Sequence, residues 1–358
     1  MGWTICKNTV ASLFLCLLFT QCKKEHKHVN TPLFPQSKKA LVVCEGSLGN
    51  GNAALTLYDR DSNKVYDDVF MNVNGQPLGD IFQSITPMGN YYFLCVNNSD
   101  KVWVLQKTDF KIAGSISITK PRYILPINDQ KAYVSTLFSN KIVIIHPQTW
   151  SILGEITMPA KNAEVMTLWN NQVIACGWDT TNNHIFYIDT QTDKVIKSVS
   201  VAGKAPQESF MDKEGLLWVL SGDAYNNIDA VFTKINPTTG QVVKTYNLPP
   251  QTEVIKPICT KNKDSIYFIE VQYDGSIQNN GIYRMSTAAS DIPSQPFLAA
   301  EKFQYFWALG IEPTTGHLWI GDPKGFTQKG TVLVYRQDGQ KLQEFKTGVG
   351  PAQFHFAE

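Results

Sequence analysis

A short apolar segment recurs seven times along this chain, and its spacing constrains the fold more than any other feature. The copies are separated by 40 to 52 residues and lie at residues 41–44, 92–95, 132–135, 173–176, 217–220, 266–269 and 318–321. Each is rich in β-branched and aromatic residues and is followed by a polar loop, further apolar segments and a turn. Four short strands per unit at this period predict the blades of a β-propeller.

The end of the chain indicates how such a ring closes. Residues 348–356 have the form of the Pro-marked segment that opens other repeats, as at Pro121 and Pro206. The remaining strands of that unit have to come from residues 40–70. We therefore predict an all-β fold, a seven-bladed β-propeller closed by pairing the C-terminal strand with N-terminal strands of the first blade. This closure leaves no open sheet edge between the first and last blades.

The repeat also bears on the cysteines. Cys44, Cys95 and Cys176 occupy the same column of the repeat in different units. Equivalent positions on neighbouring sheets are about 10 Å apart, which is beyond the reach of a disulfide. We expect buried free thiols that pack between blades.

The residues before the repeats resemble an export signal. Residues 10–19 form an apolar run too short to span a bilayer comfortably, and the run leads to Cys22. This arrangement resembles the lipobox of bacterial lipoproteins, although Gln21 stands where a small residue is usual; a plain secretory signal is the alternative. The predicted organisation is a lipoprotein signal peptide at 1–21, a flexible tether at 22–38 and the propeller at 39–358. Acyl chains on Cys22 would be the only attachment to a membrane.

Charge and motifs narrow the classes of function. The net charge is +1, without the basic excess of a nucleic-acid-binding protein. The histidines of the propeller lie in different repeats without metal-ligand spacing, at His146, His184, His317 and His355. No Gly-x-Ser-x-Gly motif is present. We expect no metal, no cofactor and no catalysis, while an enzyme site assembled from separate blades, of lyase or lactonase type, stays open as the alternative.

The loops over the central channel are the predicted binding face. They comprise the loops between second and third strands and the loops that enter each blade, and they are rich in Asn, Asp and aromatic residues. The predicted ligand-binding residues are Asn98, Arg122, Tyr123, Phe138, Trp178, Asn183, Tyr225, Asn227, Tyr273, Trp307 and Phe326. The entering loops also contain Gln83, Glu164, Gln207, Glu208, Glu253, Tyr305 and Phe306.

The chemistry of this face suits a flat polar ligand such as a corrinoid or a sugar, because aromatic faces and amide groups lie together. The alternative is structural: Asn and Asp form turns, aromatic rings fill the gaps between blades, and Arg122 pairs with a neighbouring carboxylate.

Residues 44–59, 78–84, 96–102 and 121–123 carry a resemblance to a known family. The repeats resemble the YVTN-type propellers of secreted bacterial proteins, and these four segments resemble a Bacteroidota-type surface lipoprotein family. That family includes outer-membrane lipoproteins that capture cobalamin and pass it to a TonB-dependent transporter. The resemblance implies a lipid-anchored, surface-exposed binding protein of the outer membrane with a small-molecule ligand, a corrinoid or a glycan, and a TonB-dependent transporter as partner. A surface scaffold for protein or glycan is a further alternative.

Overall fold

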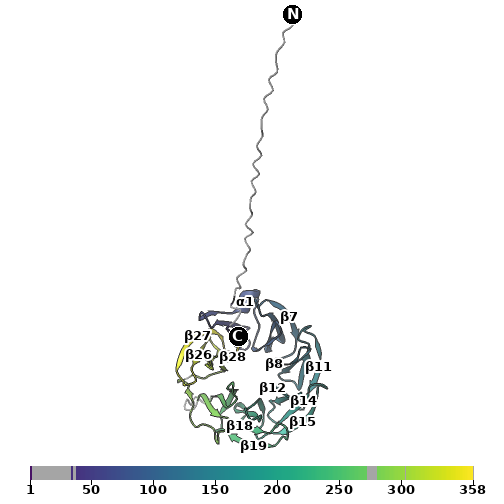
Figure 1. Ribbon diagram of the computed structural model, residues 1–358, viewed down its shortest axis with the longest axis vertical. Coiled ribbons are helices and arrows are strands. Elements are labelled where there is room, and N and C mark those ends of the chain that lie inside the picture. Colours follow the sequence, from purple (N-terminus) through teal and green to yellow (C-terminus); the bar gives the residue numbers. More distant parts are fainter. Residues whose placement is uncertain (2–33, 35–37, 272–279, 303, 358) are drawn as a thin grey trace. The chain divides into compact units, whose positions relative to one another are not determined.

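The computed structural model describes residues 1, 34, 38–271, 280–302 and 304–357. Cys22, residues 2–21 of the predicted signal peptide and most of the predicted tether lie outside the described residues. No helix of the described part of the chain is long and apolar enough to cross a membrane. Within residues 38–357, seven four-stranded antiparallel sheets form a ring around a central channel (Figure 1).

The ring is the predicted seven-bladed β-propeller. From the inner to the outer strand, the blades are β28 (Pro351–Ala357), β1 (Lys39–Cys44), β2 (Ala54–Asp59) and β3 (Lys64–Tyr66); β4 (Phe82–Met88), β5 (Tyr91–Val96), β6 (Lys101–Gln106) and β7 (Ile112–Ser117); β8 (Pro121–Asn128), β9 (Lys131–Thr136), β10 (Lys141–Ile145) and β11 (Ile152–Thr157); β12 (Ala163–Trp169), β13 (Gln172–Gly177), β14 (His184–Asp189) and β15 (Lys194–Ser200); β16 (Pro206–Met211), β17 (Leu217–Asp223), β18 (Ile228–Ile235) and β19 (Val242–Asn247); β20 (Glu253–Cys259), β21 (Ser265–Val271), β22 (Gly281–Ser286) and β23 (Leu298–Ala299); and β24 (Ala308–Ile311), β25 (Leu318–Asp322), β26 (Lys329–Tyr335) and β27 (Lys341–Val349).

The predicted closure is confirmed. β28, from the end of the chain, pairs with β1 over almost its whole length, from Lys39 opposite Ala357 to Cys44 opposite Pro351. β1 in turn pairs with β2, and β2 with β3. The first blade therefore takes its inner strand from the C-terminus and its other three strands from the N-terminal end of the ring.

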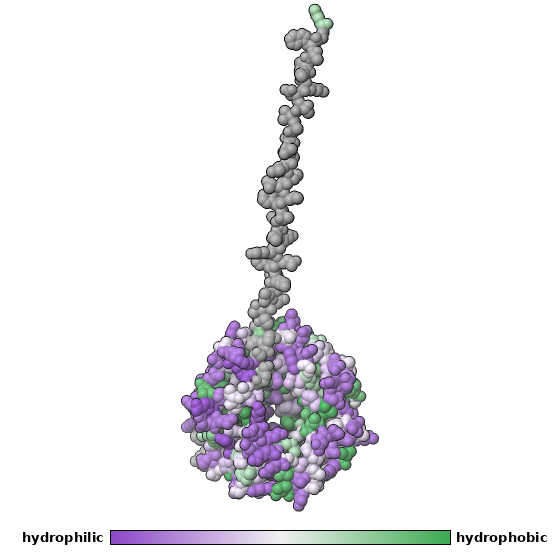
Figure 2. Space-filling view, viewed as in Figure 1, coloured by the Kyte–Doolittle hydropathy of each residue, from purple (hydrophilic) through white to green (hydrophobic). Residues whose placement is uncertain are grey.

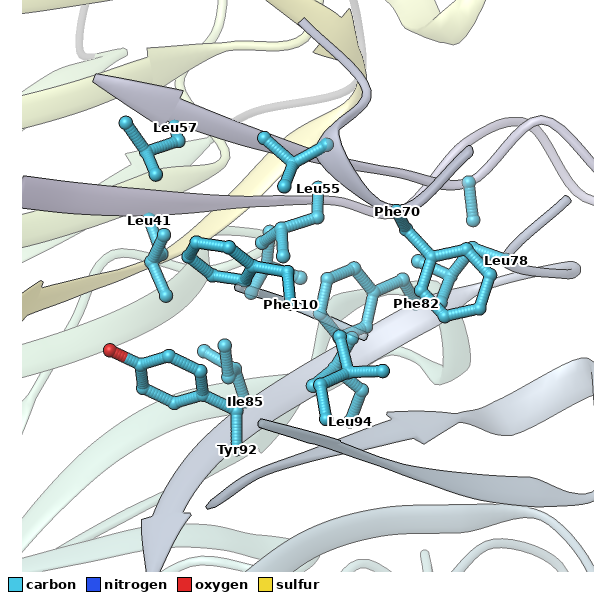
Figure 3. Packing of buried hydrophobic residues seen from close by; sticks show 14 of the residues in the cluster. Leu41, Leu55, Leu57, Phe70, Leu78, Phe82, Ile85, Tyr92, Leu94 and Phe110 are labelled. Atoms are coloured by element: carbon cyan, nitrogen blue, oxygen red, sulfur yellow. The ribbon is translucent and has the colours of Figure 1, made fainter. Parts of the chain in front are cut away.

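Both faces of each blade are buried, because alternate side chains of a strand pack against the two neighbouring blades. In β1, Leu41 and Val43 face the second blade and join a cluster with Phe82, Tyr92 and Leu94 (Figure 3). Ala40, Val42 and Cys44 face the seventh blade and pack in another cluster with Trp319 and Val332. The near-continuous apolar runs that mark the repeat follow from this burial on both sides.

The seam between the first and last blades is aromatic. The indole ring of Trp319 makes edge contacts with Tyr58, Phe345, Phe354 and Phe356, at centroid distances between 5.2 and 5.9 Å. Close by, the half-buried side chain of Arg60 forms an ion pair across the seam with the buried Glu312. Arg60 also donates from Nη2 to the carbonyl of Ala357 in β28 at 2.8 Å.

In the described part of the chain, four short helices interrupt the strands, and the sequence did not predict them. They are α1 (Val69–Asn74) and the 3₁₀ turns η1 (Asn97–Ser99), η2 (Ala224–Asn226) and η3 (Lys324–Phe326). Asp68 caps α1 by accepting from the Met71 amide at 3.2 Å, and the helix buries only Val69 and Phe70. Six residues are fewer than two helical turns, so α1 leaves no helical period in the sequence.

The cysteines of the propeller are free. Cys44, Cys95 and Cys176 are buried at equivalent places in the second strands of three blades, while Cys259 is half-buried. Burial raises the pKa of each of the four thiols to about 12. They pack as small apolar side chains, as the repeat alignment predicted.

Candidate functional site

Irregular pairing of the inner strands shapes one mouth of the channel. In six blades the pairing between the inner strand and its neighbour contains a β-bulge, near the start of the inner strand in five of them and in the middle of β20, whereas β24 pairs regularly. A bulge re-aims side chains and often lies beside a binding site. The residues at the bulges are Gln83, Arg122, Tyr123, Glu164, Val165, Gln207, Lys256, Pro257 and Ala352.

A cavity of about 400 Å³ lies at this mouth, and we call it the mouth cavity. Figure 2 shows the hollow at the centre of the ring. Most of the bulge residues line it, together with loops that follow second strands. Its lining residues are Glu45, Ile81, Gln83, Arg122, Tyr123, Leu137, Phe138, Glu164, Val165, Trp178, Gln207, Glu208, Glu253, Ile255, Lys256 and Trp307.

A polar network joins three blades on one side of the mouth cavity. Arg122 donates from Nε to both carboxylate oxygens of Glu164 at 3.1 Å, and its Nη2 lies 2.9 Å from Oε1. Its Nη1 donates to Oε1 of Gln83. Gln83 in turn donates from Nε2 to the hydroxyl of Tyr123 at 2.9 Å. Arg122 therefore does pair with a carboxylate, and the paired groups form part of the cavity wall.

Lys256 extends this network from the other side of the ring. It belongs to β20 of the sixth blade, and its Nζ donates to the hydroxyl of Tyr123, in the third blade, at 3.5 Å. Its backbone has φ of 53°, a left-handed conformation that is costly for a residue other than glycine. Such strain persists where the surrounding structure imposes it, often at functional sites. The bulge at Lys256 and Pro257 turns this side chain into the channel.

Four carboxyl groups share the mouth cavity with these two cations. Burial raises the pKa values of Glu45 and Glu253, and it raises the pKa of Glu208 to about 7, with Lys256 opposing the shift and Glu164 adding to it. Burial also works against the ammonium of Lys256, but the neighbouring Tyr123, Glu208 and Glu45 raise its pKa nonetheless. Both cations therefore keep their charge at neutral pH, whereas burial favours the protonated form of Glu208.

Aromatic side chains form the rest of the wall. Trp307 donates from Nε1 to Oε2 of Glu45 at 3.3 Å, and Phe326 packs edge-on against it with ring centroids 5.5 Å apart. Phe138 has 76% of its surface exposed at the rim. The buried Nε1 of Trp178 finds no hydrogen-bond acceptor among the described residues.

A second chamber continues the channel below. It measures about 250 Å³ and shares Tyr123, Val165, Glu208 and Lys256 with the mouth cavity. Its remaining wall is mostly apolar and comes from the inner strands β20, β24 and β28, including Ile258, Leu309, Ile311, Phe354 and Phe356. The channel thus changes from charged to apolar at the level of Lys256.

The structure brings five of the predicted ligand-binding residues together at the mouth cavity: Arg122, Tyr123, Phe138, Trp178 and Trp307. Phe326 does not line the cavity but packs edge-on against the ring of Trp307. Tyr273 lies outside the described residues.

The other four predicted residues do not line the cavity. Asn98 accepts from Lys120 and donates to Asp80, at 2.6 and 2.5 Å. Asn227 ends η2 in a left-handed conformation, with φ of 57°. Asn183 donates weakly to Ser200 at 3.5 Å, and Tyr225 projects outward with 92% of its surface exposed. The three asparagines lie in or beside turns. This agrees with the alternative given above, in which Asn and Asp on this face form turns.

Lys256 and Glu45 complete the cavity and were not among the predicted ligand-binding residues. Lys256-Pro257 is the bulge of the sixth blade, at the place that Arg122-Tyr123 holds in the third, but the two dipeptides share no residue type that would have shown this from the sequence. Glu45 follows β1 directly and begins the first of the loops over the channel. The prediction of a flat polar ligand rested on amide and aromatic side chains, so it did not include a lysine or a glutamate.

The same fold occurs in solved structures of low sequence identity to this chain. A quinonprotein alcohol dehydrogenase-like protein from Bacteroides thetaiotaomicron is 17% identical, with a TM-score of 0.66 over 90% of this chain and 79% of that one. Hydrazine synthase from Kuenenia stuttgartiensis is 15% identical, with a TM-score of 0.61 over 75% and 87%. The dihydro-heme d1 dehydrogenase NirN is 10% identical, with a TM-score of 0.59 over 90% and 76%.

These identities are low, so the likeness concerns the propeller architecture alone. No curated protein matches the sequence. A family model described as "Domain of unknown function (DUF5074)" matches residues 38–354, which is nearly the whole ring. The chain therefore belongs to the DUF5074 family.

Proposed function

We propose that this protein is a lipid-anchored surface protein that captures a small organic ligand in the mouth cavity. The observation that carries the proposal is the set of charged side chains that bulges turn toward one cavity. Burying charged groups is costly unless they are paired, and a propeller needs none at its channel. Side chains that are held rigid by neighbouring blades around a concave site favour binding.

The anchor and the partner belong to the same proposal. Cys22 would carry the lipid, residues 22–38 would give reach from the membrane, and a TonB-dependent transporter would accept the ligand. The sequence resemblance to cobalamin-capturing lipoproteins supports this arrangement.

The size of the mouth cavity bears on the corrinoid hypothesis. A volume of about 400 Å³ lies near the lower end of the range for small-molecule sites. A complete corrinoid is larger than that. It would insert one edge or side chain into the mouth cavity and rest on the exposed rim at Phe138. A smaller polar molecule would enter whole.

Calorimetric titration of the full-length protein with cyanocobalamin and cobinamide tests the corrinoid form of the proposal. We expect binding tighter than micromolar, weakened at least tenfold by Trp178→Ala and unchanged by the matched rim variant Tyr225→Ala. If neither compound gives a binding signal, corrinoids are excluded as the ligand and only smaller molecules remain as candidates.

A propeller enzyme of lyase type is the second candidate, and one observation favours it. Glu208 has a pKa of about 7 and lies among the neighbours of Lys256, which suits general acid–base catalysis at neutral pH. Across the described ranges no group of three His, Cys, Asp or Glu side chains is placed to hold a metal. Turnover of a bound ligand that Glu208→Gln abolishes, while binding persists, would establish the enzyme.

A further inference from the structure

The charges of the mouth cavity do not balance. Its walls contain the carboxyl groups of Glu45, Glu164, Glu208 and Glu253 but only two cationic side chains, Arg122 and Lys256. Both cations are held by their surroundings: Arg122 by Glu164 and Gln83, and Lys256 by Tyr123 and the nearby carboxylates. The excess of carboxyl groups makes the electrostatic potential of the cavity negative, so it should repel a negative ligand and attract a positive one.

The acceptor groups that remain belong to Glu45 and Glu208. Glu164 is occupied by the forked contact from Arg122, and Glu253 accepts from the Ala224 amide at 2.8 Å. Glu45 accepts from the indole of Trp307 at 3.3 Å, and Glu208 interacts with the backbone of Lys256. A carboxylate offers about four lone-pair positions, so both groups can accept further hydrogen bonds from a protonated amine, and their charge attracts a quaternary ammonium group, which has no N–H to donate.

The aromatic walls favour the same kind of ligand. Trp178, Trp307 and Phe138 line the cavity with the carboxylates. The cavity's own cations lie near the ring of Tyr123 instead, with Arg122 5.8 Å and Lys256 6.0 Å from its centroid. Indole faces attract organic cations, and carboxylates beside aromatic rings recognise amines and quaternary ammonium groups.

We propose that the ligand of the mouth cavity is an organic cation, whose ammonium group is held by the carboxylates of Glu45 and Glu208 and whose body packs on Trp178 and Trp307. This inference rests on the proposed function and names its ligand class. It adds the requirement of a positive charge, which the resemblance does not imply. An uncharged or anionic molecule of the same size should therefore bind poorly.

Matched probes that differ in charge provide the test. We expect glucosamine and choline to bind the full-length protein at least tenfold more tightly than glucose, and glucuronate not to bind, in calorimetric titrations at constant ionic strength. Glu208→Gln and Glu45→Gln should each weaken choline binding at least tenfold. Glu155→Gln is the matched control, because Glu155 lies in the outer strand β11 and pairs with Lys141 on the surface. Circular dichroism melts of every variant separate loss of binding from loss of folding.

Proton release gives a second readout. The titratable groups around Glu208 are Glu164 from β12, the thiol of Cys176 from β13, Lys256 from β20 and Tyr123 from β8. A bound cation favours the ionised form of Glu208, so choline binding at pH 7 should release protons. The apparent binding enthalpy should then differ between phosphate and Tris buffers. The difference should vanish in Glu208→Gln.

The outcomes separate the two proposals. If cyanocobalamin or glucose binds through Trp178 while glucosamine and choline do not, ligand capture stands and the cation inference is wrong. Choline binding that is unchanged in both Glu→Gln variants would also overturn the inference, because the cation would then lie elsewhere. If neither the probes nor cyanocobalamin bind, the proposed function fails and the inference fails with it.

Discussion

Two carboxyl groups of this propeller, Glu312 at the seam and Glu208 at the mouth cavity, face different surroundings. Glu312 accepts from Arg60, from the Thr314 and Thr315 amides at 3.2 and 2.7 Å, and from the Thr315 hydroxyl. Burial opposes its charge, but the hydrogen bonds of Thr315 and Thr314 and the charge of Arg60 lower its pKa below the usual value. The pKa of Glu208 is raised to about 7.

The difference shows how one fold uses a charged residue in two ways. At the seam, each charged oxygen meets a donor of the protein, so the ion pair is part of the structure that closes the ring. At the mouth cavity, donors are too few for the carboxyl groups present. That shortage lowers stability and leaves binding capacity for a ligand, which is the usual relation between a functional site and its scaffold.

The largest effect should follow from removing β28, which completes the seam. A chain ending at Gly350 leaves β1 with an unpaired edge and removes Phe354 and Phe356 from the ring around Trp319. We expect no cooperative thermal unfolding and a tendency to associate through the open edge. Circular dichroism melts and size-exclusion chromatography measure both. A truncated monomer that melts within a few degrees of the full chain would contradict the closure.

A single large substitution at the seam should come next. Trp319→Ala removes a side chain that is 3% exposed and contacts four aromatic rings. We expect a loss of about 3–5 kcal/mol in the free energy of unfolding. Trp178→Ala, at the half-buried wall of the mouth cavity, should cost about 1 kcal/mol or less while weakening ligand binding. If urea titrations show that the two variants lose the same free energy of unfolding, the seam and the mouth cavity do not differ in their contribution to stability.

Glu312→Gln should destabilise the protein by about 2–4 kcal/mol, because it leaves the half-buried guanidinium of Arg60 beside a neutral amide. The sign of the pH dependence follows from the lowered pKa of Glu312. Its contribution is present above the unfolded-state pKa and disappears as the pH falls through the folded-state pKa. Urea titrations at pH 7 and at pH 3 should therefore show a difference between wild type and variant that shrinks in acid. A difference that is constant with pH would mean that the charge of Glu312 does not matter.

The sequence predicted the architecture because the repeat reports burial. Each apolar segment packs between two blades, so its composition follows from the fold, and the spare strand at residues 351–357 had only one place to pair. The mouth cavity was less accessible. A bulge is one extra residue in a strand, and nothing in Arg122-Tyr123 or Lys256-Pro257 shows from sequence alone which side chain turns inward.

Residue type alone does not separate a ligand contact from a turn residue. Asn98 and Asn227 are predicted contacts because of their amides, and the structure places both in or at the end of 3₁₀ turns, outside the lining of the mouth cavity. Lys256 has no such preference and lies in a strand, where a lysine ordinarily points to solvent. Its position in the channel depends on pairing across the sheet, which a single strand sequence does not encode.

Glu208→Gln should have the opposite sign to Glu312→Gln. A raised pKa means that the folded state holds the proton more tightly than the unfolded chain, so stability falls as the pH rises from about 4.5 through 7. Glutamine removes that penalty. We expect the variant to be more stable than wild type by about 1–3 kcal/mol at pH 8 and nearly equal at pH 5. Urea titrations at the two pH values measure it. The same difference at both would show that Glu208 is ionised throughout.

We expect the smallest effect from Tyr225→Ala, and this variant tests whether the binding surface extends beyond the mouth cavity. Tyr225 lies on the loop face and was predicted from sequence to contact the ligand, yet its ring is 92% exposed and lines no part of the cavity. We expect Tyr225→Ala to change the free energy of unfolding of the protein by less than about 0.5 kcal/mol and its ligand affinity by less than twofold. If this variant weakens binding as much as Trp178→Ala, the ligand extends over the rim. The binding surface would then be the wider loop face, with the mouth cavity as its deepest point.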